Sequence, residues 1–158
     1  MTERANNTAI IYGIAGLIPF VACTILVYFL PEPTALLIAK VFVCYSTVIL
    51  SFLSGILWGT ALQKDTMTNA KKPLFAVSIG MSLLAWVTLV IVMLSSQMSS
   101  FFLTAAIAIN ALAFYTLRVF ERRLCDIHYP EWFTQLRNWL TPIVVISHFS
   151  IAALVLNL

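Results

Sequence analysis

Few residues of this chain have side chains suited to chemistry, and two of them stand inside long apolar segments. Asn110 and His148 each lie near the middle of such a segment. Polar groups at that depth in a membrane are costly, so ionisable ones are candidates for a function. If both face inward, the Asn110 amide can hydrogen-bond a neutral His148 as a structural contact between helices. The alternative is proton handling or ligand contact, because imidazole changes charge near neutral pH.

A ligand cavity is one way to combine these two residues. Pro19 should bend the first apolar segment, and the bend can open space beside Trp86, Asn110 and His148. An aromatic face with a few polar groups suits a lipophilic ligand such as a quinone, a porphyrin or a lipid. The residue types do not identify which of these cofactors or ligands is bound.

Catalytic and metal-binding patterns are missing from the sequence. Cys125 and His128, within "CDIH", offer two ligands, whereas a zinc site uses at least three protein groups. No acidic residue stands at the centre of an apolar segment, which argues against a carboxylate proton relay. We therefore predict no catalytic residue, no metal site and no nucleic-acid partner, and an enzyme is the least supported class.

The composition places the chain in a membrane. Of its 158 residues, 61% are hydrophobic and 9% charged, whereas soluble domains carry about 25% charged residues. A spanning helix needs about 20 apolar residues. We predict one all-α domain over residues 1–158, a five-helix bundle whose spans lie at about 9–30, 34–62, 73–95, 101–120 and 141–158.

Basic residues gather at one end of these spans. Eight of the nine Lys and Arg residues lie at the N-terminus, in 63–72 and in 118–138, and only Lys40 lies on the other side. The positive-inside rule then predicts a cytoplasmic N-terminus and a periplasmic C-terminus. The basic end also suits anionic lipid headgroups. The N-terminal segment resembles neither a signal peptide nor a presequence, which favours a bacterial inner membrane, with the mitochondrial inner membrane as the alternative.

The segment before the last span predicts a short helix in the headgroup layer, over residues 130–139. Its aromatic and leucine side chains share one face, and Pro142 should separate it from the span. The alternative is one continuous helix that starts near Trp132. The predicted interfacial anchors are Trp58, Trp132, Trp139, Arg123 and Arg137.

Small residues recur every four positions in the second span, at Thr47, Ser51, Gly55 and Gly59. Small residues let helix backbones approach closely in lipid, where no hydrophobic effect drives helices together. We interpret these four as a packing seam against the first or third span. The alternative is a groove for a ligand or for a helix of a partner protein.

Four segments carry a family resemblance. They are "YGIAGLIPF" (12–20), "ILSFLSGILWG" (49–59), "SLLAW" (82–86) and "YPEWFTQLRNWLT" (129–141), in this order along the chain. Together they resemble the bacterial and mitochondrial family DUF3429, the transmembrane protein 69-like proteins. The resemblance implies a helical bundle of an inner membrane and brings no established reaction.

Two functional hypotheses remain at this point. The first is an accessory, assembly or interaction subunit of a larger membrane protein complex, which rests on the small-residue seam and on how little of the chain lies outside the spans. The second is a binding or transport module for a lipophilic small molecule held in an intramembrane cavity.

Overall fold

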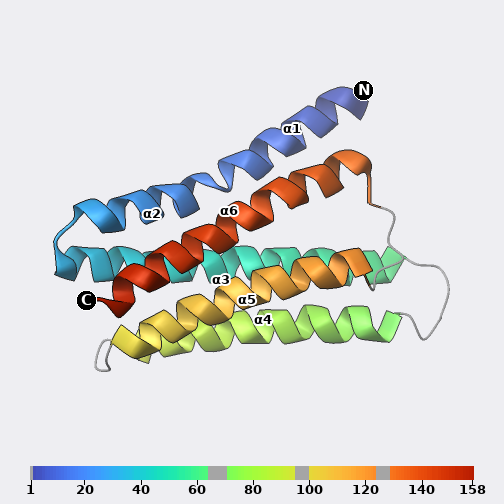
Figure 1. Ribbon diagram of the computed structural model, residues 1–158. Coiled ribbons are helices and arrows are strands. Elements are labelled where there is room, and N and C mark those ends of the chain that lie inside the picture. Colours follow the sequence, from blue (N-terminus) through green and yellow to red (C-terminus); the bar gives the residue numbers. More distant parts are fainter. Residues whose placement is uncertain (1, 64–70, 95–99, 124–128) are drawn as a thin grey trace.

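The computed structural model describes residues 2–63, 71–94, 100–123 and 129–158, and the regular structure in these ranges is helical. The helices form an elongated bundle with their long axes side by side (Figure 1). In chain order they are α1 (Thr2–Ala15), α2 (Ile18–Phe29), α3 (Glu32–Gln63), α4 (Lys71–Leu94), α5 (Ser100–Arg123) and α6 (Glu131–Leu156).

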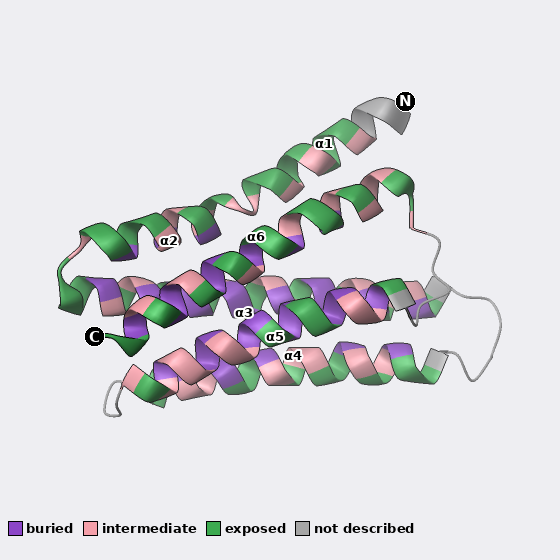
Figure 2. Ribbon diagram, in the orientation of Figure 1, coloured by how far each residue is buried: buried purple, intermediate pink, exposed green. Residues whose placement is uncertain are grey.

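Among the described residues, five helical stretches are long and apolar enough to cross a membrane, which confirms the predicted all-α membrane class and the number of spans. They are Asn6–Phe29, Glu32–Leu62, Lys72–Leu94, Ser100–Arg122 and Glu131–Leu156. Many large apolar side chains on the outside of the bundle are exposed, as lipid-facing side chains are (Figure 2). The two termini lie at opposite ends of the bundle (Figure 1), and the membrane side of each end stays a prediction.

The first span is interrupted between α1 and α2. Pro19 has no N–H to donate to the Ala15 carbonyl, and the Leu17 N–H instead donates to the Ile14 carbonyl at 2.9 Å in a tight turn. The predicted bend is therefore confirmed. The Tyr45 hydroxyl donates to the Gly16 carbonyl at 2.8 Å, which ties this turn to α3. Beyond the turn α2 packs on α3, whereas α1 leans away and packs on α6 (Figure 1).

The last span differs from the prediction. Helix α6 is continuous from Glu131 to Leu156 with Pro142 inside it, so the prediction of a separate interfacial helix over 130–139 is wrong. One buried stripe runs through the proline without a change of register: Arg137, Thr141, Val144, His148, Ile151 and Val155. Membrane helices tolerate an internal proline because neighbouring helices hold both halves in place. Here α5 packs along α6 and supplies that support.

Helix α3 is the longest helix and packs against α2, α4, α5 and α6. Its buried residues include Phe42, Ser46, Leu50, Ser54 and Leu57, spaced three or four apart. The closest polar contact with α4 is made at Ser54, whose carbonyl accepts a hydrogen bond of 2.6 Å from the Ser78 hydroxyl. Small residues at this point let the two backbones come together.

Two residues of the predicted seam, Gly55 and Gly59, leave room for a side chain that would touch no other described residue. Thr47 is buried and Ser51 half-buried, but a Cβ atom added at Gly55 or Gly59 would meet no atom within 4 Å among the described residues. The predicted packing against the first or third span is therefore not made at these glycines. The inward-facing small residue of this turn is Ser54.

Ser54 and Gly55 give a matched pair of substitutions. Ser54→Leu should lower the free energy of unfolding by about 1–3 kcal/mol, because the added volume overpacks the α3–α4 contact. Gly55→Leu should leave it unchanged or raise it, because the site is open and leucine favours a helix. Thermal unfolding in mild detergent measures both. Equal destabilisation by the two variants would contradict the placement of these faces.

Candidate functional site

His148 is buried and fully used in structural hydrogen bonds. Its Nδ1 lies 2.7 Å from the Val144 carbonyl, which only accepts, so Nδ1 carries the proton. Its Nε2 then accepts from the Ser46 hydroxyl at 2.6 Å. The rings of Phe20, Phe42 and Phe114 surround the imidazole, with centroids 4.6 to 5.9 Å away. The histidine therefore joins α6 to α3 as a neutral side chain.

Asn110 and Trp86 do not share a cavity with His148. Asn110 is buried, and its Oδ1 accepts from the Thr88 hydroxyl at 3.0 Å, so it joins α5 to α4 rather than to His148. Trp86 is 61% exposed on α4. The predicted ligand cavity at these three residues is not formed.

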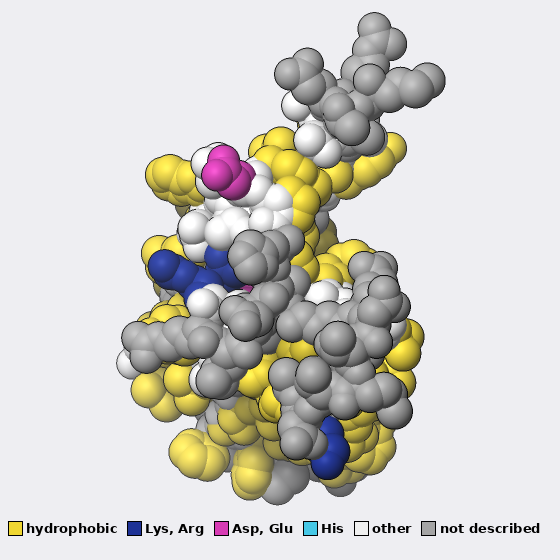
Figure 3. Space-filling model, turned by 90° about the vertical axis from the view of Figure 1, so that its right-hand side faces the viewer, with side chains coloured by type: hydrophobic (Ala, Val, Ile, Leu, Met, Phe, Trp, Pro, Cys, Tyr) yellow, Lys and Arg dark blue, Asp and Glu magenta, His cyan; other side chains and the backbone are white. Residues whose placement is uncertain are grey.

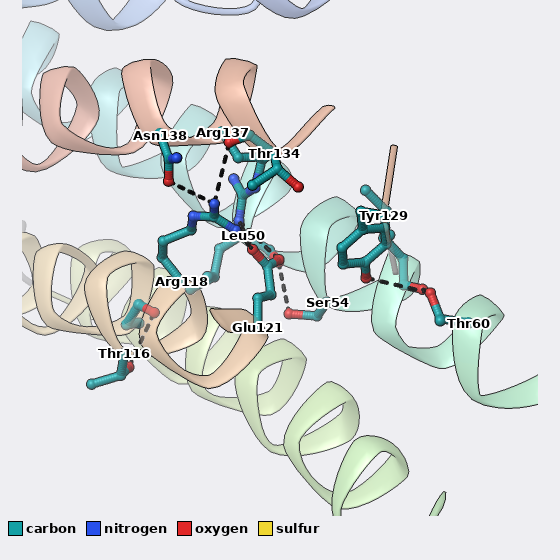
Figure 4. Close-up of polar contacts among 12 residues, drawn as sticks. Leu50, Ser54, Thr60, Thr116, Arg118, Glu121, Tyr129, Thr134, Arg137 and Asn138 are labelled. Carbon is teal, nitrogen blue, oxygen red and sulfur yellow. Dashed lines mark hydrogen bonds and ion pairs between the residues drawn. The ribbon is translucent and has the colours of Figure 1, made fainter. Parts of the chain in front are cut away.

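A charged cluster that the sequence analysis missed lies between α5 and α6 (Figure 4). Arg118 is 7% exposed, Glu121 5% and Arg137 5%. Glu121 accepts from Arg118 Nη1 at 3.1 Å and from Arg137 Nη2 at 3.0 and 3.1 Å. Arg118 Nη2 also donates to Asn138 Oδ1 at 2.7 Å and to the Thr134 carbonyl at 3.3 Å.

The cluster carries more positive than negative charge. Two guanidinium groups face one carboxylate, which leaves a net charge of +1 in the group. Removing charges from water costs several kcal/mol for each ion unless they are paired and hydrogen-bonded. The carboxylate takes hydrogen bonds from both arginines, and it thereby fixes how α5 and α6 are placed along each other.

An apolar pocket of about 400 Å³ lies between the α1–α2 turn, α3 and α6. Its walls are almost entirely apolar and aromatic: Ala9, Tyr12, Gly13, Gly16, Leu17, Phe20, Ile49, Phe52, Leu53, Ile56, Phe114, Trp132, Phe133, Leu136, Leu140 and Val144. Tyr12 and Phe52 are exposed, so the pocket opens sideways, through the surface that faces lipid. A cavity beside the Pro19 bend thus exists, with a different lining from the predicted one.

Two polar side chains complete the pocket wall, Arg137 and Thr141. Both are buried, and the Arg137 Nε and the Thr141 hydroxyl have no hydrogen-bond partner within the described ranges. Buried polar groups are normally satisfied, and each exception needs an explanation. These two are donors beside an otherwise apolar space, so the site can accept a molecule that presents an oxygen acceptor on an apolar body.

Gly13 sets the distance between the two helices on one side of the pocket. A Cβ atom at this position would lie 2.8 Å from Leu136 Cδ2, so glycine lets α1 approach α6. From Asn6 to Ala15, most of the other residues of α1 are exposed (Figure 2).

The predicted interfacial anchors occupy different environments. Trp58 and Trp139 are exposed, and their role as anchors stays a prediction, whereas Trp132 is half-buried in the pocket wall. Arg137 is buried against Glu121 instead of reaching headgroups as the sequence analysis expected. Arg123 ends α5, and its side chain lies outside the described part of the structure, as do Cys125 and His128.

The spacing of residues along α5 and α6 is the feature of the sequence that could have indicated the cluster. Glu121 follows Asn110 by eleven residues, which is three helical turns, so both lie on the same face of α5. Arg137 and His148 have the same spacing on α6. The predicted spans ended at 120 and resumed at 141, so Glu121 and Arg137 were not placed on the same helices as Asn110 and His148.

The fold and the site define a multi-pass helical membrane protein with a buried ion cluster beside an apolar pocket. The sequence matches the family described as "Protein of unknown function (DUF3429)" over residues 5–153, and the chain belongs to this family. It is 29% identical over 149 residues to "Transmembrane protein 69" of Xenopus tropicalis. That alignment covers 92% of this chain and 53% of the relative, so the chain spans about half of its length. No solved structure matches the chain.

Glu121 should contribute more to stability than an exposed carboxylate. Glu121→Gln leaves two buried guanidinium groups without a counter-charge, and we expect a loss of about 3 kcal/mol in the free energy of unfolding. Adding Arg137→Gln should recover part of the loss, which a double-mutant cycle measures. Glu131→Gln, at an exposed position in the first turn of α6, is the control and should cost less than about 1 kcal/mol. Equal effects of the two glutamate variants would show that the ion pairs do not stabilise the bundle.

Proposed function

We propose that this protein binds a lipophilic small molecule from the bilayer in the pocket between α1, α3 and α6. The observation that carries the proposal is the pair of unpartnered donors, Arg137 Nε and the Thr141 hydroxyl, beside an apolar space of about 400 Å³. Ligand pockets have volumes of about 300–1,000 Å³ and combine apolar walls with a few polar groups. A quinone, a porphyrin or a lipid has the required acceptor oxygens and apolar body.

The helices around the pocket differ in how they are held, and this supports reversible entry. Helices α3 and α6 form its fixed walls, because His148 and Ser46 join them. Helix α1 forms the opposite wall and packs mainly on α6. A ligand entering from the side displaces α1 more easily than the fixed walls. The α1–α2 turn is the point about which α1 can move.

The setting that we propose is a bacterial inner membrane, or a mitochondrial inner membrane as the alternative. The basic end of the bundle faces the cytoplasm or matrix by the positive-inside rule. Figure 3 looks at this end, where Lys and Arg side chains stand out from a largely hydrophobic body. The pocket lies toward this end, because it includes Trp132 and Phe133 from the first turn of α6.

Ligand retention and stability can be separated at Thr141. Thr141→Val removes a hydroxyl that has no partner in the described protein, so stability should be unchanged while the ligand is lost. We expect ligand retention to fall about tenfold, equivalent to about 1.4 kcal/mol. Native mass spectrometry of protein extracted gently from its own membranes, followed by chromatography of released small molecules, measures it.

Two controls accompany this experiment. Thr104→Val removes another buried hydroxyl without a partner in the described ranges, outside the pocket lining, and should not change retention. Ile49→Trp fills the pocket and should abolish retention, whereas Ile25→Trp, on the exposed face of α2, should not. A ligand held equally by wild type, Thr141→Val and Ile49→Trp would overturn the proposed site.

A second candidate function is that of an accessory subunit of a membrane complex. One observation favours it: Gly55 and Gly59 are small residues on α3 that no helix in the described chain covers. Close backbone approach at small residues is a common way for membrane helices to associate.

Gly55→Leu tests this second function, because the substitution meets no atom within 4 Å among the described residues and should leave the fold intact. A subunit that docks here should lose its protein companion in native mass spectrometry while still inserting into the membrane. Leu37→Phe, at another exposed position on α3, is the control. A companion that remains with Gly55→Leu rules out this face as its contact.

A further inference from the structure

We infer that the groove between α5 and α6 binds the phosphate of an anionic phospholipid, at a site separate from the apolar pocket. The groove has a volume of about 580 Å³ and lies beside the charged cluster. Arg118, Arg122, Arg137, Asn138 and Tyr115 line its polar part. The groove shares Arg137 and Thr141 with the apolar pocket, whereas Arg118, Arg122 and Tyr115 line the groove alone. The inference rests on these last three residues and is therefore independent of the proposed function.

The cluster has more donors than acceptors. Each guanidinium group has five N–H donors. Among the described residues, the acceptors that they reach are the Glu121 carboxylate, the Asn138 side-chain oxygen and the Thr134 carbonyl. Arg118 Nε is buried and has no partner among the residues that the structure describes. A phosphate supplies the missing acceptor oxygens, and arginine holds phosphate better than lysine because its donors form a planar fork.

The charge of the groove also matches an anion. The cluster of Arg118, Glu121 and Arg137 has a net charge of +1, and the exposed Arg122 adds another positive charge. A positive charge at the edge of a bilayer is stabilised by an anionic headgroup, and basic pockets between spans are typical lipid sites. A diester phosphate, with a single negative charge, neutralises the surplus of the cluster.

The depth of the cluster places it at headgroup level. Helix α5 has 24 residues, so it is about 36 Å long and exceeds the hydrocarbon thickness of about 30 Å. Arg118 lies five residues before the end of α5, about 7.5 Å along its axis. With Ser100 placed at the opposite boundary, about 6 Å of α5 extends past the hydrocarbon at this end, which puts the guanidinium group near the level of the lipid phosphates.

The rest of the groove suits an acyl chain, which is why we assign a phospholipid and not free phosphate. Val119, Pro142, Val145 and Ile146 continue the groove from the charged end along α5 and α6. The groove therefore offers a phosphate site joined to an apolar track, the two parts of one phospholipid.

Native mass spectrometry of the full chain in detergent tests the inference, with equimolar phosphatidylglycerol and phosphatidylcholine of identical acyl chains as probes. We expect wild type to retain phosphatidylglycerol in preference. Arg118→Gln removes the surplus charge but leaves the Arg137–Glu121 pair, so it should fold and lose about fivefold in this preference. Arg122→Gln, at an exposed position, should cause a loss of similar size and avoids any effect on the buried cluster.

Lys72→Gln is the matched control, since it removes one exposed positive charge at the start of α4, outside the groove. Its lipid preference should equal that of wild type. An equal loss with Lys72→Gln, or no preference in wild type, overturns the inference in favour of unspecific charge attraction. Displacement of the lipid by inorganic phosphate at constant ionic strength would overturn the assignment to a phospholipid. Ile49→Trp, which fills the apolar pocket and lies outside the groove, should leave phosphatidylglycerol binding intact.

Discussion

The need to neutralise charge buried between two helices fixes the arrangement of α5 and α6. Arg118, Glu121 and Arg137 lie away from water, and each of these charges is tolerable only while its partners stay in place. Because the Arg137–Glu121 pair and the hydrogen bond from Arg118 to Asn138 join the two helices, they hold the first half of α6 against α5 despite Pro142. The pocket wall at Arg137 and the groove at Arg118 both follow from this one contact.

The other polar contacts join some helices of the bundle more firmly than others. His148 joins α6 to α3, and near the opposite end of the bundle the Tyr28 hydroxyl lies 3.0 Å from the Ser150 carbonyl and joins α2 to α6. Helix α6 is therefore held at several levels. Helix α1 instead packs on α6 around Gly13, beyond a break in its own span. The wall of the pocket nearest the N-terminus therefore lies beyond this break.

The sequence predicted the features that depend on single residues and their neighbours. Hydropathy located the spans, and Pro19 marked the break in the first of them. It did not predict the ion cluster, because hydropathy scores each charge alone and does not include its neutralisation by a residue sixteen positions away. It also did not predict that Gly55 faces outward. In lipid both faces of a helix are apolar, so the pattern that separates inside from outside in a soluble helix is weak.

The pocket opens sideways, with Tyr12 and Phe52 at its rim, so the concentration that governs its occupancy is that of the ligand in the lipid phase. A molecule that enters between helices is drawn from the hydrocarbon phase, where a lipophilic compound is far more concentrated than in the surrounding water. Occupancy is then set by the mole fraction of the compound among the lipids and not by its aqueous concentration. A site of modest intrinsic affinity can therefore be filled in the membrane and emptied by dilution into detergent micelles.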